Sequence, residues 1–146
     1  MGDIDRAVEL DQVERYRFEA RYPGQPFGPA VVDEPAPTGG SAGPGPIRSL
    51  ATAVGHCMSS TLLNTLERAH VPVTTIHCVV DVEVGRNPQG RLRVQSLRLQ
   101  IHTTPVHPED QPRFDHCVAI FEDFCTVSGA VRVGIPIETH VGPGAG

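Results

Sequence analysis

The stretch GHCMSSTLLNTLERAH, residues 55–70, decides the fold because it belongs to one long apolar helix. It also places a cysteine, Cys57, inside that helix. The apolar period extends back to Pro46, which suits a first helical turn, and stops before Pro72. The predicted helix has about 24 residues and is roughly 36 Å long. Few of its residues are charged, so it needs cover on most sides, and we expect two copies of the chain to share that cover. The residues that follow the helical period are Ile47, Leu50, Ala51, Val54, Met58, Leu62, Leu66 and Ala69.

The composition is typical of an ordinary globular protein. The chain has 146 residues, of which 39% are hydrophobic and 20% are charged, and this length predicts a single domain over residues 1–146. Residues 1–11 and 142–146 are expected to be flexible ends. The polar, acidic N-terminus does not resemble a signal peptide and no apolar run is long enough to span a membrane, so we expect a cytoplasmic protein.

The charge pattern excludes some partners and some chemistry. The formal net charge is −5, and no basic patch of the kind that nucleic-acid binding requires is present. Every basic side chain apart from histidine is an arginine, so a cation in a site must be a guanidinium. The absence of lysine means that no Schiff-base lysine is available.

The pattern of the chain predicts an α+β fold in the order ββ–α–ββ–α–β. The Pro/Gly/Ser run over residues 35–46 predicts a loop that leads into the long helix. An apolar phase shift near Gln95 and Ser96 predicts a β-bulge. The predicted strands cover residues 12–22, 27–35, 76–84, 91–101 and 135–141, and the second helix covers 110–124, followed by a short helix.

The four cysteines are not equivalent. Cys78 lies on the apolar face of its predicted strand and Cys117 in the inward stripe of its helix, so both are expected to pack in the core. Cys125 precedes a short helix, whose N-terminus favours a thiolate. The position of Cys57 in the middle of a helix fits either packing or chemistry.

Histidine precedes cysteine three times, at His56, His77 and His116. Adjacent residues point about 100° apart on a helix and to opposite faces of a strand, so each histidine is turned away from its own cysteine. The spacing is not that of a zinc site. A metal-binding or redox-sensing module built on these pairs is the weakest of the alternatives.

Two blocks of sequence resemble the OsmC/Ohr family, named for osmotically inducible protein C and organic hydroperoxide resistance protein. The first, VDEPAPTGGSAGPGPIRSLATAVGHCMSSTL, is similar to the start of the family's central helix, which carries a redox cysteine. The second, FEDFCTVSGAVRVGIPIETHV, is similar to the block in which C-x-V-S precedes a short helix and a closing strand. The matching order covers roughly residues 28–141.

The resemblance implies an intertwined homodimer with antiparallel sheets around a long, buried central helix. It also implies a thiol peroxidase in which Cys57 attacks an organic or lipid hydroperoxide and becomes a sulfenic acid. Cys125 would resolve that sulfenate as a Cys57–Cys125 disulfide, which a dithiol such as a lipoyl group would reduce. No metal or organic cofactor is required.

One departure from the family pattern concerns the activation of Cys57. The peroxidases of the family have a glutamate after the proline that starts the helix, and this chain has Ile47 there. The resemblance implies an activating arginine from the N-terminal strands or loop, for which Arg21 is the candidate, and Arg48 is the polar residue next to Ile47. The alternative is a catalytically weak or inactive dimer of the same fold that binds a small apolar ligand.

Overall fold

The structure, a computed structural model, describes residues 2 and 5–144, which fall into two compact units. The first unit is built from the described residues of 1–52 with 80–98, and the second from those of 53–79 with 99–146. Residues 1, 3–4 and 145–146, part of the ends expected to be flexible, lie outside the described residues. The single domain over residues 1–146 stays a prediction.

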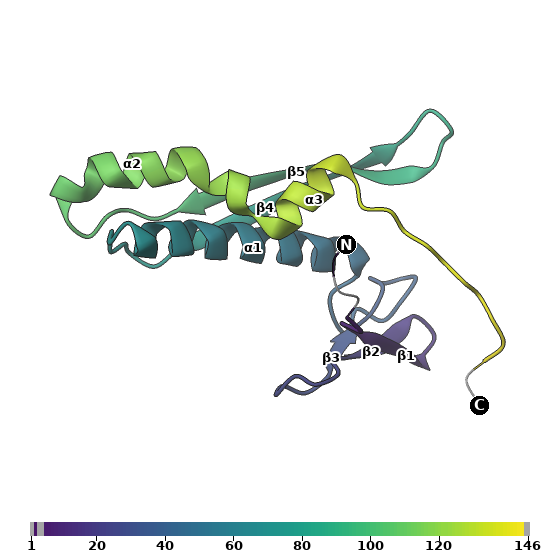
Figure 1. The fold of residues 1–146 in the computed structure, drawn as a ribbon. Helices are drawn as coiled ribbons and strands as arrows, with labels where there is room; N and C mark the ends of the chain where they lie inside the picture. The colour runs from purple at the N-terminus through teal and green to yellow at the C-terminus, as the bar shows by residue number, and fades with distance from the viewer. Residues whose placement is uncertain (1, 3–4, 145–146) are drawn as a thin grey trace. The chain divides into compact units, whose positions relative to one another are not determined.

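An antiparallel sheet in the order β1-β2-β3 forms much of the first unit (Figure 1). Its strands are β1 (Glu9–Glu14), β2 (Arg17–Arg21) and β3 (Ala30–Val32). The prediction of one strand over residues 12–22 is wrong, because Arg15 takes a left-handed conformation (φ 49°) that turns the chain between β1 and β2. β1 also begins at Glu9, inside the range 1–11 that we expected to be flexible.

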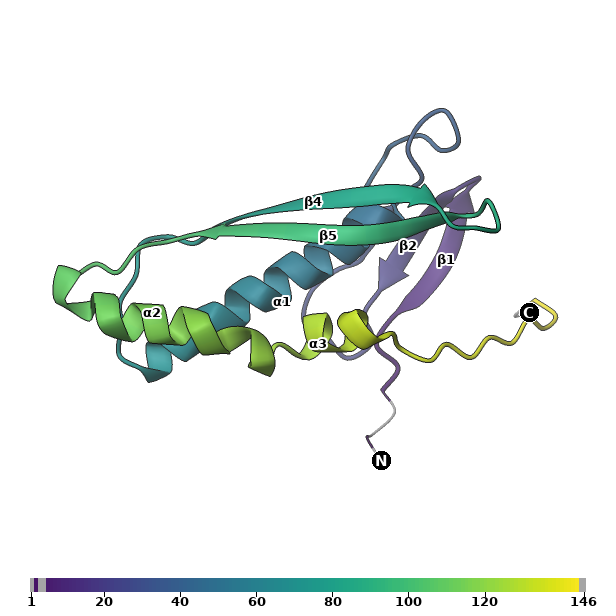
Figure 2. The same ribbon diagram turned by 90° about the horizontal axis from the view of Figure 1, so that it is seen from above.

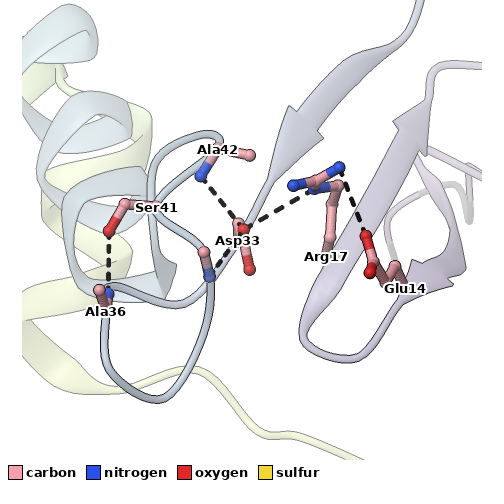
Figure 3. A network of polar contacts seen from close by, with 7 residues as sticks. Glu14, Arg17, Asp33, Ala36, Ser41 and Ala42 are labelled. Atoms are coloured by element: carbon pink, nitrogen blue, oxygen red, sulfur yellow. Dashed lines mark hydrogen bonds and ion pairs between the residues drawn. The ribbon is translucent and has the colours of Figure 1, made fainter.

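The loop between β3 and the long helix is ordered around the buried Asp33, whose carboxylate Figure 3 shows at the centre of a polar network. Its Oδ2 accepts hydrogen bonds from the backbone N–H groups of Gly40 and Ala42, each at 3.1 Å, and lies 3.8 Å from Nε of Arg17. A Cβ at Gly39 would collide with the backbone carbonyl of Glu34, so the tight loop needs glycine there. Side-chain and backbone bonds thus replace the ladder that this Pro/Gly-rich sequence cannot form.

The long helix, α1 (Pro46–Arg68), begins at the predicted proline and buries one apolar stripe. Its end is set by His70, which adopts a left-handed conformation (φ 56°), while the Val71 N–H bonds to the Leu66 carbonyl at 2.9 Å. Ile47 and Leu63 are 41% and 39% exposed, so the second side of the helix is not covered in one chain. The buried stripe consists of Ala51, Val54, Met58, Leu62 and Leu66.

Two long strands, β4 (His77–Arg86) and β5 (Leu92–His102), form a hairpin sheet (Figure 2). The turn is closed by Asn87, whose Oδ1 accepts the backbone N–H groups of Gln89 and Arg91, each at 3.0 Å. Exposed and half-buried residues alternate along β4 from His77 to Glu83, and Val84 is exposed. Along β5, residues 92–95 are all exposed and a regular alternation begins only at Leu97. The β-bulge predicted near Gln95 and Ser96 stays a prediction.

The helix predicted over residues 110–124 consists of an α-helix, α2 (Gln111–Ile120), and a 3₁₀ turn, Phe121–Phe124. The predicted short helix follows as α3 (Thr126–Val133). The prediction of a strand over residues 135–141 is not met, because this segment pairs with no other strand among the described residues. Within the described part of the chain, no helix combines the length and apolarity needed to cross a membrane.

Candidate functional site

The second unit aligns α2 antiparallel to α1, as both views of the ribbon show (Figures 1 and 2). Nη1 of Arg113 donates to the Ala69 carbonyl at 2.8 Å, and Sγ of Cys117 lies 3.7 Å from the Thr65 carbonyl. Between these two contacts the chain moves four residues back along α1, from Ala69 to Thr65, and four residues forward along α2, from Arg113 to Cys117. A further eight residues in each direction lead to Cys57 and Cys125.

The sulfur atoms of Cys57 and Cys125 lie 3.0 Å apart, although the residues are 68 positions apart in the sequence. Cys57 is half-buried beside Met58 of the apolar stripe, and Cys125 is only 3% exposed, between the buried Phe121 and the start of α3. Both thiols are free. In this contact the Cys125 thiol donates a hydrogen bond to the Cys57 sulfur, and two thiols so close can form a disulfide.

The surroundings of Cys125 favour its charged form. Burial by itself raises the pKa of this thiol, but the polar groups of its neighbours Cys57, Ser128 and Thr61 outweigh burial. The net result is a pKa for Cys125 below the ordinary thiol value. The position of the residue just before α3 adds the free N–H groups of a helix start.

A groove of about 660 Å³ opens beside Cys57, between α1 and α2. It is lined by small hydroxyl side chains of α1 such as Thr61, by Ile120 of α2 and by Phe124 of the 3₁₀ turn. Arg68 and His116 line the same groove. A ligand of mixed apolar and polar character fits such a surface, and the Cys57 sulfur is accessible from it.

The two candidate arginines belong to the first compact unit. Arg21 lies at the end of β2, where Nη2 is 3.2 Å from Glu9 Oε2 and Nη1 pairs with Asp11. Hydrogen bonds to Glu9 and to Asp11 raise the pKa of Arg21 further above its ordinary value. Arg48 lies in the first turn of α1, two and a half turns before Cys57 in the sequence of that helix. The roles of both arginines stay predictions.

The other cysteines are placed as packing residues. Cys117 is buried at 2% exposure, and Cys78 is half-buried on β4. Among residues 2 and 5–144, no three side chains of histidine, cysteine, aspartate or glutamate gather as a metal site requires.

Ser128 and Thr61 are contacts of Cys125 that the sequence analysis did not single out. The sequence carried a signal for Ser128. Cys125 directly precedes α3, and Ser128 is the third residue of that helix. The N–H and side chain of the third residue face back toward the start of a helix. Thr61 carried no such signal, since its contact depends on how two distant helices align.

The chain belongs to the OsmC-like protein family, whose sequence model matches residues 38–140. A comparison with curated protein sequences gives no match. The match of the family model includes both Cys57 and Cys125.

Solved structures share this fold at low sequence identity. An OsmC-like protein from Mycoplasma pneumoniae is 14% identical with a TM-score of 0.71, covering 90% of this chain and 89% of that one. An OsmC-like protein of unknown function from Vibrio cholerae is 13% identical with a TM-score of 0.67, covering 89% and 94%. An organic hydroperoxide resistance protein from Elizabethkingia anophelis is 16% identical with a TM-score of 0.60, covering 90% and 91%. These similarities establish the α+β fold.

Proposed function

We propose that this chain is a thiol-dependent peroxidase that reduces organic or lipid hydroperoxides with Cys57 as the reacting cysteine and Cys125 as its partner. The observation that carries the proposal is the 3.0 Å separation of the two sulfur atoms. The groove beside Cys57 supports the proposal, because a hydroperoxide must reach the Cys57 sulfur while the Cys125 sulfur is in contact with it.

The chemistry runs in three steps. The Cys57 sulfur attacks the outer oxygen of the hydroperoxide, the O–O bond breaks, and the alcohol leaves as Cys57 becomes a sulfenic acid. The Cys125 sulfur then displaces the sulfenate oxygen as water and a Cys57–Cys125 disulfide forms. A dithiol reductant of the lipoyl type returns both residues to thiols by exchange.

The proposal includes a homodimer and a compartment that keeps thiols reduced, the cytoplasm. Apolar residues that remain exposed in one chain, such as Ile137 near the C-terminus, support the dimer. An arginine that assists the Cys57 thiolate is also proposed. Because the guanidinium of Arg21 is already paired with two carboxylates, Arg48 is the freer of the two candidates.

The test is the consumption of cumene hydroperoxide with dihydrolipoamide as reductant. The wild-type protein should turn over, Cys57→Ser should not, and Cys78→Ser should match the wild type, since Cys78 lies on β4 outside the sulfur pair. A Cys57→Ser variant that keeps the wild-type rate, or a wild-type protein without turnover, contradicts the proposal.

A second candidate is a catalytically weak or inactive dimer that binds a small apolar ligand. The size of the groove favours it, as does Ile47 in place of the family's glutamate. It predicts that Cys125 stays unpaired after mild peroxide treatment and that Cys57 alkylates slowly in the native protein.

A further inference from the structure

Cys57 and Cys125 are two free thiols in contact, and one of them opens onto a groove. They belong to the same compact unit, and their sulfur atoms lie 3.0 Å apart. Cys57 lines the groove of about 660 Å³, whereas Cys125 is 3% exposed. One atom that enters by the groove can therefore bond to both sulfurs, provided that its bond angles suit their separation.

The separation of the sulfurs selects the geometry of such an atom. At a bond length of about 2.3 Å, the length of a zinc–thiolate bond, sulfurs 3.0 Å apart subtend an angle of about 80° at the bound atom. With the same bond length, a tetrahedral angle needs the sulfurs about 3.8 Å apart and a linear arrangement about 4.6 Å. A pyramidal atom with angles near 90° needs about 3.3 Å, so it fits with the smallest movement of the two side chains.

The number of sulfurs sets a second condition. Cys117 also lines the groove, but its thiol donates to the Thr65 carbonyl at 3.7 Å. Thr65 lies eight residues beyond Cys57 on α1, about 12 Å along the helix axis. Within the described part of the chain no third histidine, cysteine or carboxylate completes a metal site. The site therefore offers two soft sulfur ligands to one atom.

We propose that Cys57 and Cys125 form a binding site for trivalent monoorganoarsenicals, compounds of the type RAs(OH)₂. Trivalent arsenic is a soft, pyramidal centre that prefers sulfur ligands. With one carbon substituent it has two exchangeable positions, which match the two sulfurs, whereas inorganic arsenite has three. The inference does not depend on the peroxidase function proposed above.

The groove provides a place for the carbon substituent R. Ile120 and Phe124 line the groove together with Cys57, and the Phe124 side chain is 67% exposed. An aromatic R group that lies against these two side chains removes apolar surface from water and can pack on the Phe124 ring. An aryl arsenical therefore suits the site better than a methyl arsenical.

The binding reaction balances in atoms and changes no oxidation state. The Cys57 sulfur displaces one hydroxyl of RAs(OH)₂, and its thiol proton leaves with that hydroxyl as water. The Cys125 sulfur displaces the second hydroxyl in the same way, within the complex. The products are RAs bonded to both sulfurs and two water molecules, with arsenic trivalent throughout.

The second arsenic–sulfur bond makes the complex tight, because it forms within one molecule. Joining two binding events in this way raises affinity by about 10²–10⁴-fold. Thiol exchange also depends on access to the atoms that react. Since Cys125 is 3% exposed, a monothiol in solution should release the arsenical poorly, whereas a small dithiol can replace both bonds.

The experiment measures the binding of phenylarsine oxide to the full, reduced chain. Intact-mass spectrometry after gel filtration should show one phenylarsenic unit per chain with the loss of two hydrogens, retained in excess glutathione and removed by 2,3-dimercaptopropanol. Cys57→Ser and Cys125→Ser should each weaken binding by about 100-fold or more, because only one bond remains. Cys78→Ser should bind like the wild type. Wild-type binding by Cys57→Ser or by Cys125→Ser overturns the inference.

The place of R in the groove has its own test. Phe124→Ala should weaken the binding of phenylarsine oxide and leave that of its methyl analogue unchanged, since only the phenyl group reaches the Phe124 ring. Equal affinities of Phe124→Ala and the wild type for phenylarsine oxide contradict this placement.

Peptide mapping of the wild-type adduct tests the inference without any variant, should the serine variants not fold. The phenylarsenic unit should join the peptide of Cys57 to that of Cys125. An adduct on other cysteines, or no adduct, overturns the inference. A chain that binds the arsenical at this pair but consumes no hydroperoxide supports the inference and contradicts the proposed function, and the reverse result does the opposite.

Discussion

At the scale of single residues, Cys125 joins two properties that oppose each other. It is almost fully buried, yet its polar neighbours lower its pKa. A buried group with a lowered pKa links folding to pH, because the folded chain holds fewer protons than the unfolded chain over part of the pH range.

The sign of that linkage gives a first prediction. Since the folded-state pKa of Cys125 is depressed, its stabilisation is complete above about pH 8.5, the ordinary thiol value, and is lost as the pH falls through the folded-state value. The free energy of unfolding of the reduced wild type, relative to Cys125→Ser, should therefore rise with pH within that window. Denaturant titrations across the window measure it, with Cys78→Ser as the control.

A difference in unfolding free energy that is flat or falls with pH would contradict the lowered pKa of Cys125. The same trend in the Cys78→Ser control would show that the pH dependence belongs to the whole chain.

How far the site could be predicted differs from residue to residue. The helix-start position of Cys125 is visible in the sequence, because a short helix follows it directly. The partnership of Cys57 with Cys125 came from the family resemblance. Ser128 was missed although its position three residues after Cys125 was visible, because what its hydroxyl faces depends on the packing around it. The alignment of Thr65 with Cys117 could not be read locally for the same reason.

At the scale of elements, α1 was predicted well because its signals are local. Pro46 starts it and its apolar positions recur at the helical period, and the structure buries that stripe. The β-strands were predicted less well, since a strand needs a partner. The turn at Arg15 divided one predicted strand, and residues 135–141 have the alternation of a strand without a neighbour to pair with.

The stripe of α1 gives a second prediction. Leu66 is fully buried at 0% exposure, so Leu66→Ala should lower the free energy of unfolding by about 2–5 kcal/mol. Leu63→Ala on the same helix, where the side chain is 39% exposed, is the control and should cost clearly less. Chemical denaturation followed by circular dichroism compares the two.

Equal losses at positions 63 and 66 would mean that a surface outside the single chain covers Leu63. A small loss at Leu66 would contradict the packing of α1 described above.

At the scale of the whole molecule, the C-terminal segment exposes apolar side chains that alternate along the chain. Ile135, Ile137 and Val141 are 58%, 87% and 89% exposed. Alternating apolar residues suit a strand with one covered face, and no strand of the described chain pairs with them. The proposed homodimer would supply that cover.

This leads to a third prediction, on assembly. Light scattering after size exclusion should give twice the 15.7 kDa of one chain. Ile137→Asp should shift the mass toward one chain, because a charge would be buried at the interface. Glu138→Ala, one residue further along the same segment, should leave the mass unchanged. A wild-type protein of single-chain mass contradicts the dimer.

The central claim is that Cys57 and Cys125 act as one redox pair, and peptide mapping after one equivalent of cumene hydroperoxide tests it most directly. The account predicts a loss of two hydrogens from the intact chain and a single cross-linked peptide joining Cys57 to Cys125. Recovery of both residues as alkylatable thiols, or a disulfide that pairs either of them with Cys78 or Cys117 instead, would contradict it.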